Sequence, residues 1–151
     1  MKKLNKLTKK LSIMKEIILD TNFCLLPFRL RIDIFKEIER ICDFNYELSV
    51  PEEVVAELLK LSKSNSKTGR YAKAAIALLQ QKGIKFTKSK KVINTSILQN
   101  TEKDGDEAII SYAKENKDAI IATDDKLLMK RLPGFDFIST RQKQYLTLRK
   151  N

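Results

Sequence analysis

The stretch Ile17-Ile18-Leu19-Asp20-Thr21-Asn22 is an apolar run that ends in an acid. Three aliphatic residues followed by Asp-Thr-Asn predict a short buried strand whose end meets a loop or helix. In open parallel sheets the functional crevice lies at the carboxyl ends of the strands, so chemistry is expected at Asp20. The pattern recurs at 119–125, Ala-Ile-Ile-Ala-Thr-Asp-Asp. Two such strands, each ending in a carboxylate, predict a cation site.

Extended and helical patterns alternate along the rest of the chain. Further strands are expected at 46–50, 84–87, 119–123 and 135–139, and helices at 32–41, 52–61, 70–82, 106–113 and 126–132. Strands separated by helices predict a parallel sheet covered on both faces. Residues 23–30, which contain Pro27, are expected to form a turn. The predicted organisation is a basic extension (1–14, with Met14 as a second candidate start), one domain (15–145) and a basic tail (146–151).

The amino-acid composition limits the kinds of catalysis that are open to the chain. A chain of 151 residues with 42% hydrophobic residues can build a core, and it has no apolar run long enough for a membrane span. The absence of histidine excludes Ser-His-Asp and Cys-His catalysis and most zinc sites. Because the chain has two cysteines and no secretory signal, we expect a soluble cytoplasmic protein whose cysteines are reduced.

The net charge of +11 is unevenly distributed. Six lysines and no acid occur in residues 1–15, and ten Lys or Arg and no acid in residues 58–101. A field of one sign over so much chain favours a polyanionic partner, with nucleic acid ahead of an acidic membrane surface. The alternative is a basic surface that only keeps the protein soluble.

Four acids are expected to converge on the crevice: Asp20, Glu57, Asp106 and Asp125. Clustered carboxylates repel by about 4 kcal/mol per pair at 4 Å and an effective dielectric constant of 20, and a divalent cation removes that cost. Oxygen ligands alone favour Mg²⁺ or Mn²⁺, which can polarise a phosphodiester and lower the pKa of a bound water. Each acid also has a structural alternative: Asp20 and Asp106 as caps, Glu57 as a solvated helix residue, and one of Asp124 and Asp125 as the cap of the short helix while the other faces the site.

These acids lie in segments that resemble the PIN-domain nucleases. Residues 17–22 look like the opening motif of that family, and 50–58, 104–113 and 121–128 resemble the segments that carry its second, third and fourth acids. The family's spacing to Ala113 and to Thr123 selects Asp106 and Asp125. Additional carboxylates stand beside them as further candidate ligands: Asp104, Glu107 and Asp124.

The resemblance implies a three-layer α/β/α sandwich with a five-stranded parallel sheet in the order 3-2-1-4-5. It implies a Mg²⁺- or Mn²⁺-dependent endoribonuclease, with Asn22 and Thr123 as supporting residues. Within the family, residues 20–28 and 141–145 look most like the archaeal proteins related to eukaryotic small-subunit rRNA-processing nucleases. An rRNA precursor is therefore the expected substrate, with phosphate contacts from Lys67, Arg70 and Lys73.

Two alternatives remain at this point. The first is a non-catalytic RNA-binding module of ribosome assembly, and the second is a VapC-type toxin ribonuclease. The expected partners are RNA together with an assembly factor or an antitoxin, and dimerisation is common in the family.

Overall fold

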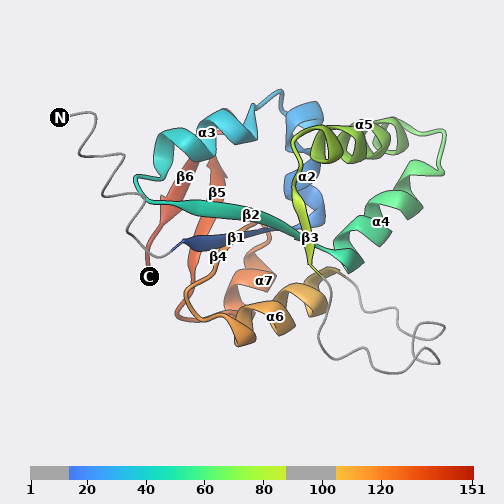
Figure 1. Cartoon of the computed structure of the whole chain (residues 1–151). Coiled ribbons are helices and arrows are strands. Elements are labelled where there is room, and N and C mark those ends of the chain that lie inside the picture. Colours follow the sequence, from blue (N-terminus) through green and yellow to red (C-terminus); the bar gives the residue numbers. More distant parts are fainter. Residues whose placement is uncertain (1–13, 88–104) are drawn as a thin grey trace, which may run out of the picture.

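A central β-sheet organises the protein. The computed structural model describes residues 14–87 and 105–151, and the sheet strands there run in the order β3-β2-β1-β4-β5-β6 (Figure 1). The five strands from β3 to β5 are parallel and follow the predicted order 3-2-1-4-5. Their bounds are β1 (Lys15–Leu19), β2 (Tyr46–Pro51), β3 (Lys85–Thr87), β4 (Ile120–Ala122) and β5 (Asp136–Arg141), and the antiparallel β6 follows at Tyr145–Arg149.

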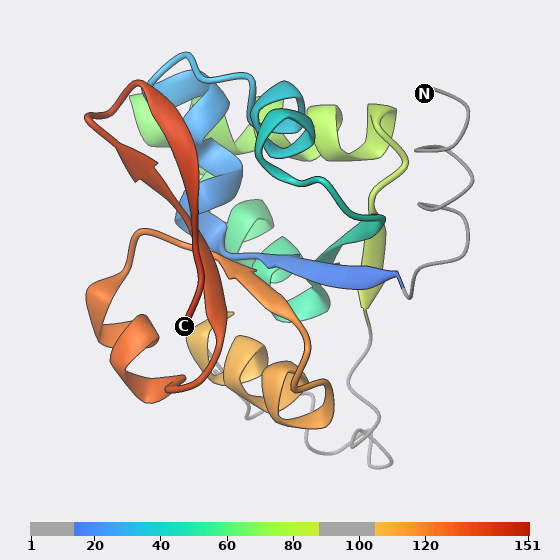
Figure 2. The same ribbon diagram turned by 90° about the vertical axis from the view of Figure 1, so that its left-hand side faces the viewer.

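Helices cover both faces of this sheet. They are α2 (Thr21–Arg29), α3 (Ile34–Ile41), α4 (Glu52–Ser62), α5 (Lys67–Gln81), α6 (Gly105–Glu115) and α7 (Lys126–Arg131). Figures 1 and 2 show α6 and α7 on one face, with α2, α3 and α5 on the other. The fold is therefore the predicted α/β/α sandwich. No helix in the described ranges is long and apolar enough to cross a membrane.

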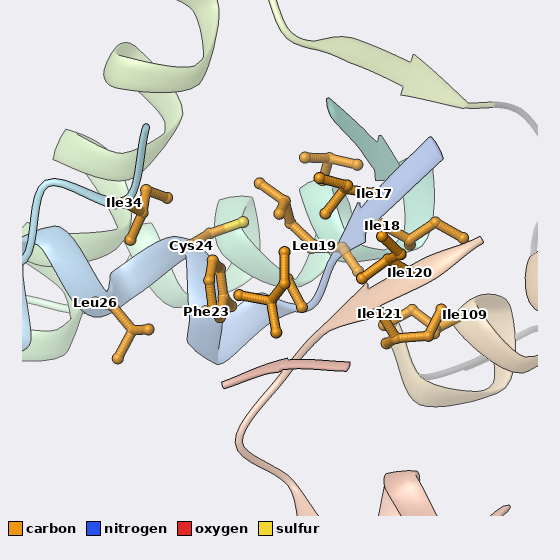
Figure 3. Packing of buried hydrophobic residues seen from close by; sticks show 14 of the residues in the cluster. Ile17, Ile18, Leu19, Phe23, Cys24, Leu26, Ile34, Ile109, Ile120 and Ile121 are labelled. Atoms are coloured by element: carbon orange, nitrogen blue, oxygen red, sulfur yellow. The ribbon is translucent and has the colours of Figure 1, made fainter. Parts of the chain in front are cut away.

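The core forms around the two strands whose pattern predicted it. Ile17, Ile18 and Leu19 of β1 are fully buried, as is Ile121 of β4 beside them. Figure 3 shows these residues packed with Phe23 and other apolar side chains from both layers. Strands covered on both faces have no solvated side, which explains why their sequences are continuous rather than alternating apolar runs.

The predicted turn at residues 23–30 is instead the helix α2, with Pro27 inside it. Proline lacks an N–H donor and disfavours a helix interior, which was the reason for expecting a turn. Three features outweigh this cost: Asp20 caps the helix, and Phe23 and Leu25 are buried against the core. Helix α5 likewise begins three residues before the predicted position, because Ser66 accepts a hydrogen bond from the Gly69 N–H and caps it.

Residues 146–151 were expected to be a basic tail, and this prediction was wrong for most of the segment. Tyr145–Arg149 forms β6, which pairs antiparallel with β5 and extends the sheet to a sixth strand. Leu146 is fully buried, and its backbone accepts a hydrogen bond from Arg40 and donates one to Glu37 on α3. The basic residues of this segment led to the expectation of a tail. The segment is instead a strand because Leu146, between more exposed neighbours, is buried in the core.

Replacement of Leu146 tests whether β6 belongs to the cooperative fold. Leu146→Ala is expected to lower the free energy of unfolding by about 2–5 kcal/mol, because it removes a fully buried side chain from a packed core. Urea denaturation followed by circular dichroism measures this. Thr147→Ala, on the same strand, is the control and should change stability much less. A loss below about 1 kcal/mol for Leu146→Ala would mean that the strand is only loosely attached.

Candidate functional site

Asp20 lies at the carboxyl end of the central strand. Leu19 pairs with Ala122 of β4, and the Asp20 N–H donates to the Ala122 carbonyl at 3.2 Å. Asp20 is only 4% exposed and is the residue from which α2 begins. The side chain that follows the first apolar run is thus held inside the protein at the predicted sheet edge.

Two donors fix the Asp20 carboxylate. Its Oδ1 accepts a hydrogen bond from the Phe23 N–H at 2.6 Å, and its Oδ2 accepts one from the Thr123 hydroxyl. The pKa of Asp20 is raised to about 7, mainly by burial; the charges of Asp106 and Asp124 also raise it, and both hydrogen bonds lower it. The two donors therefore compensate the charged form of Asp20 only in part.

Thr123 connects the ends of β1 and β4. It is fully buried, donates to Asp20, and accepts a hydrogen bond from the Asp125 N–H at 3.0 Å. A single hydroxyl thus fixes the position of one acid and the backbone of another. The supporting role of Thr123 in the function of the site stays a prediction.

Glu57 joins three helices at the same edge. It projects from α4, where its Oε2 accepts a hydrogen bond from the Thr21 hydroxyl at 2.5 Å and its Oε1 accepts one from the Gly105 N–H. Thr21 begins α2 directly after Asp20, so Asp20 and Glu57 are linked through adjacent residues. Glu57 is therefore oriented by the chain rather than freely solvated.

Thr21 and Gly105 are site residues that the sequence analysis missed. A Cβ at Gly105 would lie 3.1 Å from Glu57 Oε2 and 3.2 Å from Thr21 Oγ1, so glycine permits the close approach of α6. Their positions in the sequence could have indicated them, since Thr21 follows Asp20 and Gly105 precedes Asp106. Neither position reveals a contact with Glu57, which is 36 residues from Thr21 and 48 from Gly105 in sequence.

Asp106 occupies the first turn of α6 and is partly buried. Its effect on the pKa of Asp20 shows that its charge faces the same region. Glu107 is directed elsewhere, since its Oε1 lies 2.6 Å from the Arg131 guanidinium in an ion pair with α7. Asp104, another candidate ligand, lies outside the described residues.

The adjacent acids after β4 have different partners. Asp125 caps α7, because its Oδ1 accepts hydrogen bonds from the N–H groups of Leu127 and Leu128 at 2.9 and 3.2 Å. Asp124 is exposed and accepts from both the N–H and the hydroxyl of Thr140, at 2.7 and 2.9 Å. Asp124 therefore attaches the end of β5 to the site, and Asp125 attaches the start of α7.

The donor chemistry fits a divalent cation. Asp20, Glu57, Asp106 and Asp125 are brought by β1, α4, α6 and α7 to one edge of the sheet. In the conformation described, no three Asp, Glu or Cys side chains within 14–87 and 105–151 are close enough together to hold a metal ion. Oxygen donors alone suit Mg²⁺ or Mn²⁺, and such an ion would stabilise the charged form of Asp20, which burial disfavours. The identity of the direct ligands stays a prediction.

The predicted substrate-binding residues lie on helix surfaces. Lys67, Arg70 and Lys73 are all exposed and recur every three residues on α5, which gives them one helix face. Asn22, the other predicted supporting residue, is exposed on α2 and accepts a hydrogen bond from Arg29 at 3.1 Å. No direct contact between Asn22 and Asp20 is seen.

The arrangement defines a class of protein: an α/β/α domain with a carboxylate site at the carboxyl ends of its central parallel strands. Residues 17–143 match the model of a family described as a PIN-like domain. The chain belongs to this PIN-like domain family, as the resemblance in its motifs predicted.

Individual relatives agree with this assignment. The chain is 33% identical over 137 residues to ribonuclease VapC4 of Methanocaldococcus jannaschii, a match that covers 89% of this chain and 97% of that protein. Its fold is similar to that of the PIN domain endonuclease Utp24, with a TM-score of 0.70, 19% identity, and coverage of 90% and 92% of the two chains. A chain in the structure of VapBC2 from Rickettsia felis, bound to a DNA fragment from their promoter, is similar with a TM-score of 0.57, 20% identity, and coverage of 83% and 99%.

The Thr123 hydroxyl can be tested by an isosteric change. Thr123→Val keeps the volume but removes a donor to Asp20 and an acceptor for the Asp125 N–H, so we expect a loss of about 1–3 kcal/mol in the free energy of unfolding. Thr123→Ser keeps the hydroxyl and is the matched control. Urea denaturation at neutral pH compares them. If the valine variant is as stable as the serine variant, the hydroxyl does not support the site.

Proposed function

We propose that this protein is a ribonuclease that hydrolyses phosphodiester bonds of RNA with Mg²⁺ or Mn²⁺. The observation that carries the proposal is that Asp20, Glu57 and Asp106 come from elements that end or begin at the same sheet edge, with Asp20 buried and Glu57 held by two helix termini. Membership of the PIN-like family and the 33% identity to a ribonuclease support it.

Each residue of the site has a role in this proposal. Asp20, Glu57, Asp106 and Asp125 would hold the cation, which when bound supplies polarisation of the phosphodiester and a more acidic water. Hydroxyl groups of Thr21 and Thr123 orient the first two carboxylates, and Gly105 lets its own N–H reach Glu57. Side chains fixed before substrate arrives need no reorganisation during the reaction.

The charge distribution is consistent with an RNA substrate. A net charge of +11 attracts a polyanion over the whole molecule, while the acids at the site repel phosphate unless a cation is present. Lys67, Arg70 and Lys73 would bind phosphates of the RNA from the exposed face of α5. Binding would thus be general and electrostatic, and cleavage would be confined to the carboxylate site.

The comparisons favour a VapC-type ribonuclease over the rRNA-processing function that the motifs suggested. The 33% identical relative is ribonuclease VapC4, whereas the similarity to Utp24 is at 19% identity and concerns the fold. Similarity to a chain of the VapBC2 structure supports a protein partner of the antitoxin kind. A cytoplasmic location and a homodimer are part of the same proposal.

Substitution of the buried acid tests catalysis. Asp20→Asn is expected to reduce Mn²⁺-dependent RNA cleavage by at least about 100-fold, because residues that only support metal ligands already contribute 10–100-fold. EDTA should abolish wild-type cleavage, and added Mn²⁺ should restore it. Cleavage of a labelled RNA, followed on gels, measures both effects.

Asp118→Asn is the control, since Asp118 is exposed and lies just before the start of β4 at the other edge of the sheet. It should cleave like the wild type. Cleavage that survives Asp20→Asn would contradict the assigned site. Salt-dependent RNA binding by a wild type that never cleaves would instead favour the non-catalytic RNA-binding module.

The VapC-type assignment has a separate test in cells. Induced expression of the wild-type chain should arrest growth, because an uninhibited ribonuclease degrades RNA that the host requires. Asp20→Asn, expressed to the same level, should not arrest growth. Normal growth with active wild-type enzyme present would contradict the toxin assignment and favour a processing role.

A further inference from the structure

The hairpin between β5 and β6 extends past the carboxyl edge of the sheet. Ile138 of β5 pairs with Ala122, the last residue of β4, and β5 continues to Arg141 before the chain turns back at Tyr145. Figure 2 shows this hairpin rising beyond the end of β1 beside α2. Its turn, residues 141–144, thus lies on the side of the sheet where the acids gather.

Hydrogen bonds attach the hairpin to the candidate site. Thr140, the residue before the turn, donates to Asp124 through both its N–H and its hydroxyl, at 2.7 and 2.9 Å. Asp124 stands between Thr123 and Asp125, each of which is part of the site. The position of the turn relative to the carboxylates is therefore fixed.

The turn carries unpaired positive charge. Arg141 and Lys143 are exposed, and neither forms an ion pair with any described residue. From residue 137 to residue 151 the sequence has four Lys or Arg and no Asp or Glu. These two side chains are therefore available to bind an anion.

The backbone of the turn is strained at two residues. Gln142 and Lys143 both have a φ of 54°, and the Gln144 N–H donates to the Arg141 carbonyl at 3.2 Å. Hairpin turns with positive φ at both central residues favour Asn or Gly, because L side chains rarely adopt this conformation. Local strain of this kind is typical of functional sites, so the turn is a candidate for a functional element.

We propose that the β5–β6 turn binds the phosphate backbone of the RNA substrate through Arg141 and Lys143. In the sheet order, the strands that carry the site, β1 and β4, lie between β5 and β2. Figure 1 shows α5 and the β5–β6 hairpin on opposite sides of α2, the helix that begins after Asp20. An RNA strand across the acidic edge would therefore meet positive charge on both sides, from α5 and from the turn. This inference rests on the proposed ribonuclease function and adds a second binding element to it.

The first experiment removes the two charges. Binding of a fluorescein-labelled single-stranded RNA oligonucleotide is measured by anisotropy in EDTA, where no cleavage is expected, over a range of salt concentrations. Arg141→Ala/Lys143→Ala should weaken binding at least about tenfold and reduce the slope of log affinity against log salt by about 1.4, for two phosphate contacts on a single strand. The control, Lys114→Ala/Lys117→Ala, removes the same charge from exposed positions near the opposite edge and should change neither.

A second experiment uses the two strained positions as a matched pair. Gln142→Gly and Lys143→Gly both relieve a positive φ, so both variants should melt at a higher temperature than the wild type. Only Lys143→Gly removes a charge, and only it should weaken RNA binding. This pair separates the function of the side chain from the stability of the turn.

Several results would overturn the inference. The first is that Arg141→Ala/Lys143→Ala binds RNA as tightly as the wild type. The second is that the Lys114→Ala/Lys117→Ala control loses as much RNA affinity. The third is that the turn variant loses affinity only for an acidic protein partner. If the wild type cleaves RNA and the turn variants bind RNA normally, the turn is not an RNA contact, but the ribonuclease proposal stands. Turn-dependent RNA binding by a wild type that never cleaves would reject the catalytic proposal and leave the turn as an RNA contact.

Discussion

The buried carboxylate of Asp20 is the constraint on which the rest of the site depends. A charged group in the interior is costly unless donors or a cation compensate it. Here the Phe23 N–H and the Thr123 hydroxyl compensate it in part, and they also fix how α2 leaves β1 and how β1 meets β4. The pKa of Asp20 is still raised to about 7, so these donors do not fully compensate its charged form, and a bound cation would stabilise that form. The same interactions therefore order the centre of the fold and prepare it for a cation.

Charge is arranged at two scales around that carboxylate. Asp106 and Asp124 are close enough to raise the pKa of Asp20. The chain holds Asp124 through Thr140, and it holds Glu57 at the same edge through Thr21 and Gly105. Basic residues give the whole molecule its net charge of +11. Long-range attraction thus favours a polyanion, while short-range repulsion makes its close approach to the acids dependent on a cation. This separation suits an enzyme that binds many RNA segments but cleaves at one point.

Local sequence predicted the sheet well because buried parallel strands have a strong signature. The apolar runs at Ile17–Leu19 and Ile120–Ala122 gave both the strands and the edge at which their acids lie. Helix α2 was not predicted because proline normally interrupts a helix, and Pro27 lies within it. Strand β6 was not predicted because its basic residues indicated an exposed tail, whereas Leu146 is buried. The bonds from Thr21 and Gly105 to Glu57 could not be predicted, since they join residues 36 and 48 positions apart and depend on how helices pack. Sequence thus located the acids and Thr123, but not Thr21 and Gly105, which orient Glu57.

The central claim is that acids from separate parts of the chain form one cation site at the end of β1. Crystals of the protein soaked in Mn²⁺, with diffraction data collected for the anomalous signal of manganese, test this most directly. The account predicts an anomalous peak within bonding distance of the Asp20 carboxylate, with oxygen ligands from at least one other of the four acids. A well-diffracting soaked crystal with no peak beside Asp20, or with manganese bound only at distant surface acids, would contradict it.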